Sequence, residues 1–306
     1  SHCEAYFFEV VMDALNSEHV MSEALLAANE NLSEILNAEI LALKGAMRPP
    51  IDEIMRATLE KLNSNTHFNK IVVLLETPGG FIEVVERIAI ALRHNFSSVE
   101  FIVPNYAYSA GTVLVMSGDE IHMDYFSVLG PIDPQHQAED GSYVPGMGYL
   151  AKFNELIQVV NNDADGNATR AEMAILLKKF DPAKLFHIEQ SIEHSKSLLM
   201  DWLPRYKFKD WTIRETSGEP VTEADRKERA KHIAEVLGDA QRWHSHGRGI
   251  TIRELQSEAI KLKVSDLELD GARRKAVWDY HSLFVDYMQK RAMQGAIHSR
   301  CGMRVL

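Results

Sequence analysis

Apolar residues recur at helical spacing through the first part of the chain. Between residues 4 and 46 they return every three or four positions, with Glu and Asn between them, which predicts a helix over this range. The positions that carry the pattern are Leu25, Leu32, Ile35, Leu36, Ile40 and Leu43. The triplet RPP at 48–50 ends this run, because proline lacks an amide hydrogen and restricts the residue before it. A second amphipathic helix is predicted from about Ile51 to Leu62.

The pattern then changes to short apolar runs of the kind found in buried strands. KIVVLLE (70–76) and VEFIVPN (99–105) are strand-like, and EIHMD (120–124) is a third short strand. The amphipathic stretch FIEVVERIAIALRH (81–94) separates the first two, and YAYSAGTVLVMSGDE (106–120) supplies a helix before the third. This alternation predicts an α/β fold with a parallel sheet and right-handed crossovers.

After about residue 147 the chain reads as mostly helical. Helices are predicted near 148–160, 172–180, 182–203, 222–237, 252–261 and 271–294. Thr222 and Asp225 have the spacing of a capping box, and 204–220 is predicted to be a loop or hairpin. We therefore expect an N-terminal helical segment (1–50), an α/β core (51–147) and a helical part (148–306).

The composition is that of an ordinary globular protein, and it argues against some classes of binding partner. Of 306 residues 45% are hydrophobic, and the net charge of -11 argues against a nucleic-acid phosphate track. No apolar run reaches the roughly 20 residues of a membrane-spanning helix, and the N-terminus lacks the pattern of a signal peptide. Cys3 and Cys301 have no CxxC partner, so a metal or redox role is not expected, and a reduced cytoplasmic setting fits best.

Two strand-to-helix junctions carry the candidate chemistry. In LLETPGGFIE (74–83), Gly79 and Gly80 permit backbone conformations that aim a free amide at a bound oxygen, although a tight turn without function has the same sequence. In VPNYAYSAGT (103–112), Ser109 starts a helix, where serine is a common N-cap. Ser109 is equally a candidate nucleophile, because the amide of Ala110 lacks an intrahelical partner and would stabilise an oxyanion beside it. Both junctions lie at the carboxyl ends of parallel strands, where α/β proteins place their sites.

Three stretches together make a more specific resemblance. ETPGG (76–80), NYAYSAGT (105–112) and GPIDPQ (130–135) resemble the Clp protease/crotonase superfamily and its signal-peptide-peptidase-like serine peptidases. The chain looks most like the serine dehydrogenase proteinase family, with further matches at KFDPAKL, DWLPRYKFKDW, RWHSHGRGI and VWDYHSLFVDYM. The resemblance implies a Clp protease/crotonase-like parallel-sheet core with a largely helical C-terminal half, and a peptide or protein substrate. It also implies these site residues: Ser109 as nucleophile, the amides of Gly80 and Ala110 as the oxyanion hole, and Gly79, Gly130, Pro131 and Ile132 along the substrate.

Serine needs a base, and two candidates remain open. Clp peptidases use a histidine about 25 residues after the serine, where this chain has Gly130 to Asp133, with His136 a few residues further on. Signal-peptide-peptidase-like enzymes use a lysine roughly 40 residues after the serine, which matches Lys152. We expect the neighbours Leu150, Ala151 and Phe153 to desolvate this lysine and lower its pKa, which favours a Ser109–Lys152 dyad.

The segment NNDADGNATRAE (161–172) resembles a calcium-binding EF-hand loop. Its ligand positions would be filled by Asn161, Asp163, Asp165, Asn167 and Glu172, with Gly166 at the turn. The first position is usually Asp, no second loop is evident, and a polar interhelical turn has the same composition. Calcium is therefore an optional cofactor, expected to tune the position of Lys152 if it binds. His244 and His246 have no evident third ligand and are expected to be structural or cleft-lining.

The sequence thus predicts a serine peptidase that forms homo-oligomers, as the resemblance implies, with no nucleic-acid partner and no integral membrane segment. Two alternatives stay open on the same fold. One is a crotonase-type acyl-CoA enzyme, which would use the paired amides on a thioester enolate without Ser109. The other is a non-catalytic scaffold or binding module.

Overall fold

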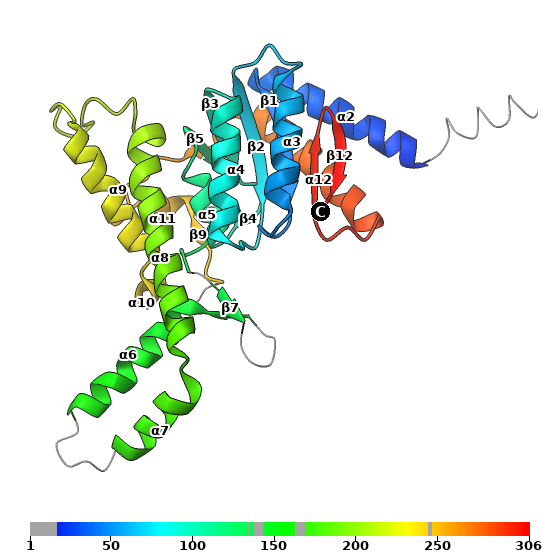
Figure 1. The fold of residues 1–306 in the computed structure, drawn as a ribbon. Coiled ribbons are helices and arrows are strands. Elements are labelled where there is room, and N and C mark those ends of the chain that lie inside the picture. The colour runs from blue at the N-terminus through cyan, green and yellow to red at the C-terminus, as the bar shows by residue number, and fades with distance from the viewer. Residues whose placement is uncertain (1–16, 134, 138–142, 163–168, 244–246) are drawn as a thin grey trace, which may run out of the picture.

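A seven-stranded sheet forms the centre of the protein, with helices on both faces (Figure 1). The computed structural model describes residues 17–133, 135–137, 143–162, 169–243 and 247–306. The strands, in spatial order, are β10 (Ser265–Asp266), β5 (Glu120–Met123), β3 (Ser98–Ile102), β2 (Lys70–Glu76), β1 (Glu39–Lys44), β11 (Ala296–Ser299) and β12 (Gly302–Val305). The first five are parallel, and the β11–β12 hairpin adds two antiparallel strands. The predicted parallel α/β core is confirmed.

The two faces of the sheet bury different sets of helices. The helices α3 (Ile51–Asn63), α4 (Ile82–Asn95) and α5 (Ala110–Val115) pack on one face. The helices α2 (Ser17–Leu36) and α12 (Gly271–Lys290) cover the other. Alternate residues of each strand serve the two layers, since Leu41 and Val73 belong to the first core and Ile40 and Val72 to the second.

The prediction of one helix through residues 4–46 is wrong for residues 39–44, which form the strand β1. Asn37 adopts a positive φ of 47° just after α2, which turns the chain out of the helix. The run EILALK then pairs with β2 on one side and β11 on the other, in a slot buried on both faces. The same apolar residues fit a helix by period, and the two neighbouring strands decide the outcome.

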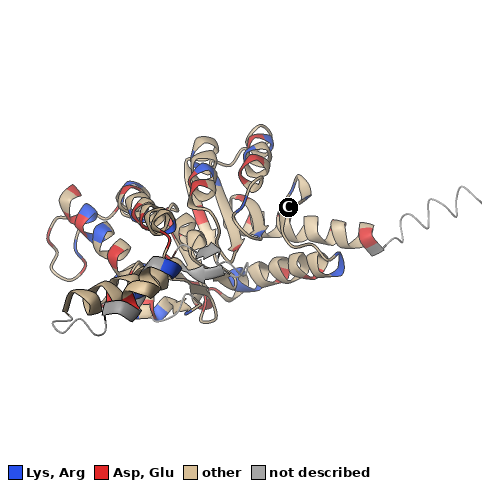
Figure 2. Ribbon diagram, turned by 60° about the horizontal axis from the view of Figure 1, so that its bottom comes forward, with Lys and Arg blue, Asp and Glu red and all other residues tan. Residues whose placement is uncertain are grey.

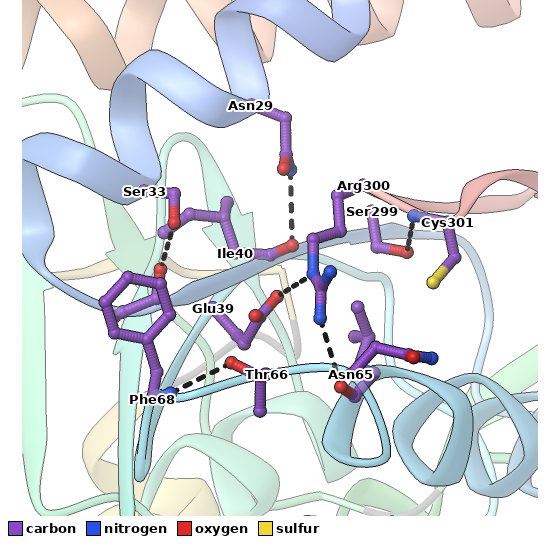
Figure 3. Close-up of polar contacts among 12 residues, drawn as sticks. Asn29, Ser33, Glu39, Ile40, Asn65, Thr66, Phe68, Ser299, Arg300 and Cys301 are labelled. Atoms are coloured by element: carbon purple, nitrogen blue, oxygen red, sulfur yellow. Dashed lines mark hydrogen bonds and ion pairs between the residues drawn. The ribbon is translucent and has the colours of Figure 1, made fainter.

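Polar contacts fix the entry to β1 (Figure 3). Arg300 of the β11–β12 turn donates to Glu39 Oε2 at 2.9 Å and to the carbonyl of Leu62 at 3.1 Å. Asn29 of α2 donates to the carbonyl of Ile40 at 3.2 Å. The first two residues of β1 are therefore held by the C-terminal hairpin and by α2, and Arg300 links them to the end of α3.

Smaller sheets surround the carboxyl edge of the large one. The strands β4 (Tyr106–Ala107), β6 (Val128–Leu129) and β9 (Ile250–Thr251) form a three-stranded sheet, and β7 (Gln135–Gln137) pairs with β8 (Tyr143–Pro145). Thr77, which follows β2, bridges to Ala107 of β4. This bridge ties the glycine turn after β2 to the segment that leads into Ser109.

The remaining helices lie mostly in the C-terminal half, as predicted. They are α6 (Gly146–Asn162), α7 (Thr169–Lys179), α8 (Pro182–Trp202), the π-helical turn Leu203–Lys207, α9 (Glu223–Leu237), α10 (Ala240–Trp243), α11 (Ile252–Gln256) and the 3-10 turn Leu267–Leu269. The capping box predicted from Thr222 and Asp225 is present at the start of α9. The pair α6 and α7 projects from the body of the protein (Figure 1).

Strands from all three predicted parts of the chain share one sheet. β1 comes from the N-terminal part, and β10, β11 and β12 come from the part predicted to be helical. The division at residues 50 and 147 stays a prediction about domains, but the large sheet crosses both positions.

Charged residues of both signs alternate over the ribbon rather than gathering by sign (Figure 2). In the part of the chain that the structure describes, no helix combines the length and apolar character needed to cross a bilayer.

Candidate active site

Ser109 stands at a strained turn between β4 and α5. Its φ is 53° and its ψ is -118°, a conformation that non-glycine residues seldom adopt. Such a turn between a strand and a helix is the geometry that presents a nucleophile in many hydrolases. Ser109 occupies the N-cap position of α5, but its side chain makes no capping hydrogen bond, so the capping interpretation is wrong for the hydroxyl.

The hydroxyl of Ser109 instead points to the strip that follows β6. Its Oγ donates to the carbonyl of Asp133 at 2.8 Å, and the serine is only 5% exposed. Thr112 of α5 fixes the same strip, because its Oγ1 donates to the carbonyl of Gly130 at 2.9 Å and accepts from the Gly130 amide at 3.0 Å. Ser109 therefore faces an ordered peptide segment on one side.

The glycine turn TPGG lies against the other side of Ser109. A Cβ on Gly79 would lie 2.9 Å from the Cβ of Ser109 and 3.4 Å from the amide nitrogen of Ala110. A Cβ on Gly80 would lie 2.2 Å from the carbonyl oxygen of Met47, so only glycine fits there. Gly79 and Gly80 also have φ values of 98° and 153°. The tight turn is confirmed, and the functional interpretation of this sequence stays a prediction.

Two backbone amides next in the chain to Gly79 and Ser109 have no hydrogen-bond acceptor among the described residues. The amides of Gly80 and Ala110 donate no hydrogen bond within the described residues, whereas their neighbours Gly79, Phe81 and Gly111 all do. Gly79 donates to Thr77 Oγ1 at 3.0 Å, Phe81 to Met47 O at 2.8 Å and Gly111 to Tyr108 O at 2.8 Å. Ala110 is 4% exposed, and a buried backbone amide is seldom left without a partner, so its amide fits an oxygen atom brought by a substrate, whereas Gly80 is exposed.

A buried ionic network lies at the same edge of the sheet. Lys44 and Glu76, the last residues of β1 and β2, are paired in register and form an ion pair. His281 of α12 contacts Glu76 Oε2 at 2.8 Å. Burial lowers the pKa of Lys44, and burial together with the Lys44 ammonium lowers the pKa of His281 to about 4. The Lys44 ammonium also lies 5.9 Å from the centre of the Tyr106 ring in β4, so the network supports the segment that carries Ser109.

The structure places Lys152 on α6, exposed to solvent. Its side chain is 58% exposed and pairs with Glu155 at 2.9 Å. The expected desolvation by Leu150, Ala151 and Phe153 is wrong for the single chain, because the face of α6 that packs on α8 contains Met147 and Leu150 and excludes Lys152. Within the described residues Ser109 and Lys152 make no hydrogen bond with each other, so the dyad stays a prediction.

The other predicted site residues lie in the strip that follows β6 and in the strand β7. His136 lies in β7, opposite Val144 of β8. Gly130 is packed on Tyr108, since a Cβ there would lie 2.5 Å from the Tyr108 ring, and Ile132 is 1% exposed. Pro131 lies between them in the buried strip. The role of this strip in holding a substrate stays a prediction.

The calcium loop lies mainly outside the described residues. Asp163, Asp165 and Asn167 belong to that part, as do His244 and His246. Asn161 lies in the last turn of α6 and Glu172 in the first turn of α7, so helices flank the loop as predicted. One observation fits a cation: Oε2 of Glu172 is buried and has no hydrogen-bond partner in the described structure. Among the described residues no group of three or more His, Cys, Asp and Glu side chains could hold a metal ion.

Three residues that hold the site were not singled out from the sequence. Thr77 accepts from Gly79, Thr112 anchors Gly130, and Asp133 accepts from Ser109. All three stand within the quoted stretches ETPGG, NYAYSAGT and GPIDPQ. Their place within these stretches was the only sign of their importance in the sequence. Their hydrogen bonds could not be predicted, because they depend on which stretches meet in space.

Comparison with known proteins agrees with this geometry. Residues 51–144 match the family model of the ClpP-like SDH-type serine proteinases, which confirms the resemblance found in the sequence. Two uncharacterised proteins of Methanocaldococcus jannaschii are similar, one with 42% identity over 63 residues and the other with 38% over 84 residues. These alignments cover 21% and 28% of this chain and 22% and 28% of the relatives, so the chain spans about a quarter of their length.

Among solved structures, the ClpP protease catalytic domain from Plasmodium falciparum is similar at 18% identity. That likeness covers 30% of this chain and 53% of the other, with a TM-score of 0.28. The matched family segment contains the strained serine, the glycine turn and the strip at Asp133. The similarity to the ClpP-like SDH-type serine proteinases is therefore located in residues 51–144, the part of the chain that carries the candidate site.

Proposed function

We propose that this protein is a serine peptidase in which Ser109 attacks the carbonyl carbon of a peptide bond. The observation that carries the proposal is the position of Ser109, held at φ 53° against Gly79 of the glycine turn, with the adjoining amides of Gly80 and Ala110 making no hydrogen bond within the described residues. Attack converts the carbonyl oxygen into an oxyanion, which both amides would stabilise by hydrogen bonds. The amine then leaves, and water hydrolyses the acyl-enzyme in a second attack that uses the same two amides.

Lys152 is the general base in this proposal. It would take the proton from Ser109 Oγ and return it to the leaving amine. The helix that carries it is connected to the serine, because the Met147 amide at the start of α6 donates to Asp133 Oδ1 at 2.9 Å and the Asp133 carbonyl accepts from Ser109. Lys152 has to leave Glu155 and lose water contact to act as a base, which substrate or a neighbouring subunit over α6 would bring about. Homo-oligomers are part of the proposal for this reason.

A fluorophosphonate probe tests the nucleophile. We expect the protein to be labelled at one serine and to lose labelling and peptide hydrolysis together when Ser109→Ala is introduced, because no other group can form the acyl-enzyme. The control is Ser97→Ala, at an exposed serine that precedes β3. Thioester turnover that survives Ser109→Ala would favour the crotonase-type enzyme, and absence of both labelling and turnover in the parent protein would favour the scaffold.

The base is tested by the pH dependence of labelling. Lys152→Met should abolish the rise of the labelling rate with pH and lower the rate by about 10²- to 10⁴-fold, the usual contribution of a general base. The matched variant is His136→Gln. If it, and not Lys152→Met, removes the pH dependence, the base is the histidine and the dyad is wrong.

A further inference from the structure

A groove runs between α6 and α8, next to the candidate site. Its volume is 920 Å³, and its lining comes from α6, from α8 and from Gly238 after α9. The apolar side chains Met147 and Leu150 of α6 face Ile192 of α8, and all three belong to one small hydrophobic cluster. This volume lies at the upper end of the range for ligand sites, so it has room for more than a single side chain.

The inner end of the groove is hydrogen-bonded to the strip that holds Ser109. Met147, at its inner end, donates to Asp133 Oδ1, and the carbonyl of Asp133 accepts from Ser109. On the other wall Gly238 follows Leu237, whose carbonyl accepts from the Ile132 amide at 2.9 Å. Two lining residues, Met147 and Gly238, thus stand at or next to residues hydrogen-bonded to Asp133 and Ile132.

The charged residues that line the groove are Glu155, Glu189, Glu193 and Lys196, so carboxylates outnumber cations there. Glu155 of α6 pairs with Lys152, and Glu193 of α8 pairs with Lys196 at 3.4 Å. Lys196 packs against Gly238, because a Cβ added to Gly238 would lie 3.3 Å from the Cε of Lys196. Glu189, which also lines the groove, makes no ion pair with any residue of the described chain. One carboxylate of the lining therefore has no cation, beside an apolar floor.

We propose that this groove receives the substrate polypeptide on one side of the cleaved bond and selects a lysine or arginine side chain there. The aliphatic part of such a side chain would pack on Met147, Leu150 and Ile192, and its charge would meet Glu189. Substrates with a carboxylate at this position are disfavoured by the same residues. The inference rests on the proposed peptidase function, since it assigns the polarity of that enzyme's substrate.

Matched peptides measure this selection. Quenched fluorescent peptides that differ only by Lys, Gln or Glu, placed in turn at each position on both sides of the cleaved bond, are compared by kcat/KM. At the position that enters the groove we expect kcat/KM for the Lys peptide to exceed that for the Gln peptide by about 3- to 10-fold, and the Glu peptide to have the lowest value. The advantage of Lys should shrink at high salt, because salt screens a partly solvated ion pair. Glu189→Gln should bring Lys and Gln together, whereas Glu228→Gln, a change at an exposed glutamate of α9, should leave the preference intact.

Binding separates failure of the groove from failure of the peptidase. The fluorescence anisotropy of a labelled Lys peptide is measured with Ser109→Ala, which cannot turn it over, and with Ser109→Ala combined with Glu189→Gln. Tighter binding to the first variant supports the groove even if the parent protein hydrolyses nothing. Equal binding by both variants, or cleavage by the parent protein without preference among Lys, Gln and Glu at every position, overturns the inference.

Discussion

At the scale of single residues, the candidate site depends on two backbone conformations that are rare for most amino acids. Ser109 has a positive φ that costs a few kcal/mol in ordinary settings, and the hydrogen bond from its hydroxyl to Asp133 and the packing of Gly79 against it hold that conformation. Gly80 occupies a position where the carbonyl of Met47 leaves no room for a side chain. The strain is thus concentrated where a nucleophile and two free amides are brought together.

Gly80→Ala should therefore reduce activity strongly. The added methyl group has to push against the Met47 carbonyl, which displaces the Gly80 amide from Ser109. We expect the rate of acylation to fall by about 10²- to 10³-fold, the effect of losing one oxyanion donor. The rate is measured with the fluorophosphonate probe, and a thermal melt separates this loss from unfolding. Gly271→Ala is the control, because a Cβ at Gly271 meets nothing within 4 Å. Normal acylation in Gly80→Ala would show that its amide plays no part.

At the scale of elements, the segment from α6 to α7 brings three candidate features together. Lys152 lies on α6, the groove runs along the α6 face that meets α8, and the calcium-loop candidate follows directly. α6 is anchored at its start, through Met147 and Asp133, and at its packing with α8. Because one rigid helix links these features, a change at its distal end would be transmitted to Lys152 and to the groove.

Calcium binding predicts a measurable stabilisation of this segment. If the loop 161–172 binds Ca²⁺, a concentration 100-fold above Kd stabilises the folded state by about 2.7 kcal/mol, which raises the melting temperature. Differential scanning fluorimetry with Ca²⁺, and with Mg²⁺ for comparison, measures the shift. Asp163→Ala should remove it. A melting temperature that is unchanged by Ca²⁺ in the parent protein identifies the loop as a polar turn.

At the scale of the whole molecule, a buried polar network connects the first helix, the last helix and the C-terminal hairpin. Asn29 of α2 donates to the Tyr280 hydroxyl at 3.0 Å, and that hydroxyl contacts His298 Nδ1 of β11 at 2.7 Å. A neutral imidazole can accept the Tyr280 hydroxyl proton at Nδ1. Burial lowers the pKa of His298 to about 4. Elements from both ends of the chain thus depend on one uncharged histidine.

This histidine predicts a loss of stability in mild acid. Its pKa is about 4 in the folded protein, against an unfolded value of 6.5. The unfolded state therefore takes up the proton first, and the contribution of His298 to stability is complete above pH 6.5 and is lost as the pH falls from 6.5 toward 4. Between pH 7 and pH 5 we expect a loss of about 2 kcal/mol from this residue.

Urea unfolding at both pH values measures the effect. His298→Asn, which keeps an acceptor for Tyr280 but does not titrate, should reduce the loss between pH 7 and pH 5 by about 2 kcal/mol. His94→Asn, at an exposed histidine on α4, is the comparison. An equal pH dependence in His298→Asn and the parent protein would contradict the prediction.

Much of this architecture follows from local sequence. The runs at 70–76 and 120–124 become β2 and β5, and the amphipathic stretch after Ile51 becomes α3, because their period and length are those of one element type. Ser109 and the glycines at 79 and 80 could be identified because they stand directly after strands. Helix α12 was predicted four residues too long, and α11 is shorter than predicted, since helix ends depend on capping and packing.

Local sequence could not predict the elements and contacts that depend on residues distant in the chain. β1 reads as a continuation of a helix, and β11 and β12 have no strong period, yet all three enter the sheet because their neighbours cover them. The exposure of Lys152 was likewise not predictable, since Leu150 packs toward α8 and Phe153 contacts Phe180 instead of covering the lysine.

The sequence by itself determined the parallel α/β core, the serine between β4 and α5 and the glycine turn after β2, because each depends on residues adjacent in the chain. Only the tertiary structure decided that the hydroxyl of Ser109 binds Asp133, that Gly79 packs against the serine, and that Met147, bonded to Asp133, lines a groove between α6 and α8. These features arise where segments far apart in the chain meet, and their geometry depends on the packing of the whole sheet and its helices.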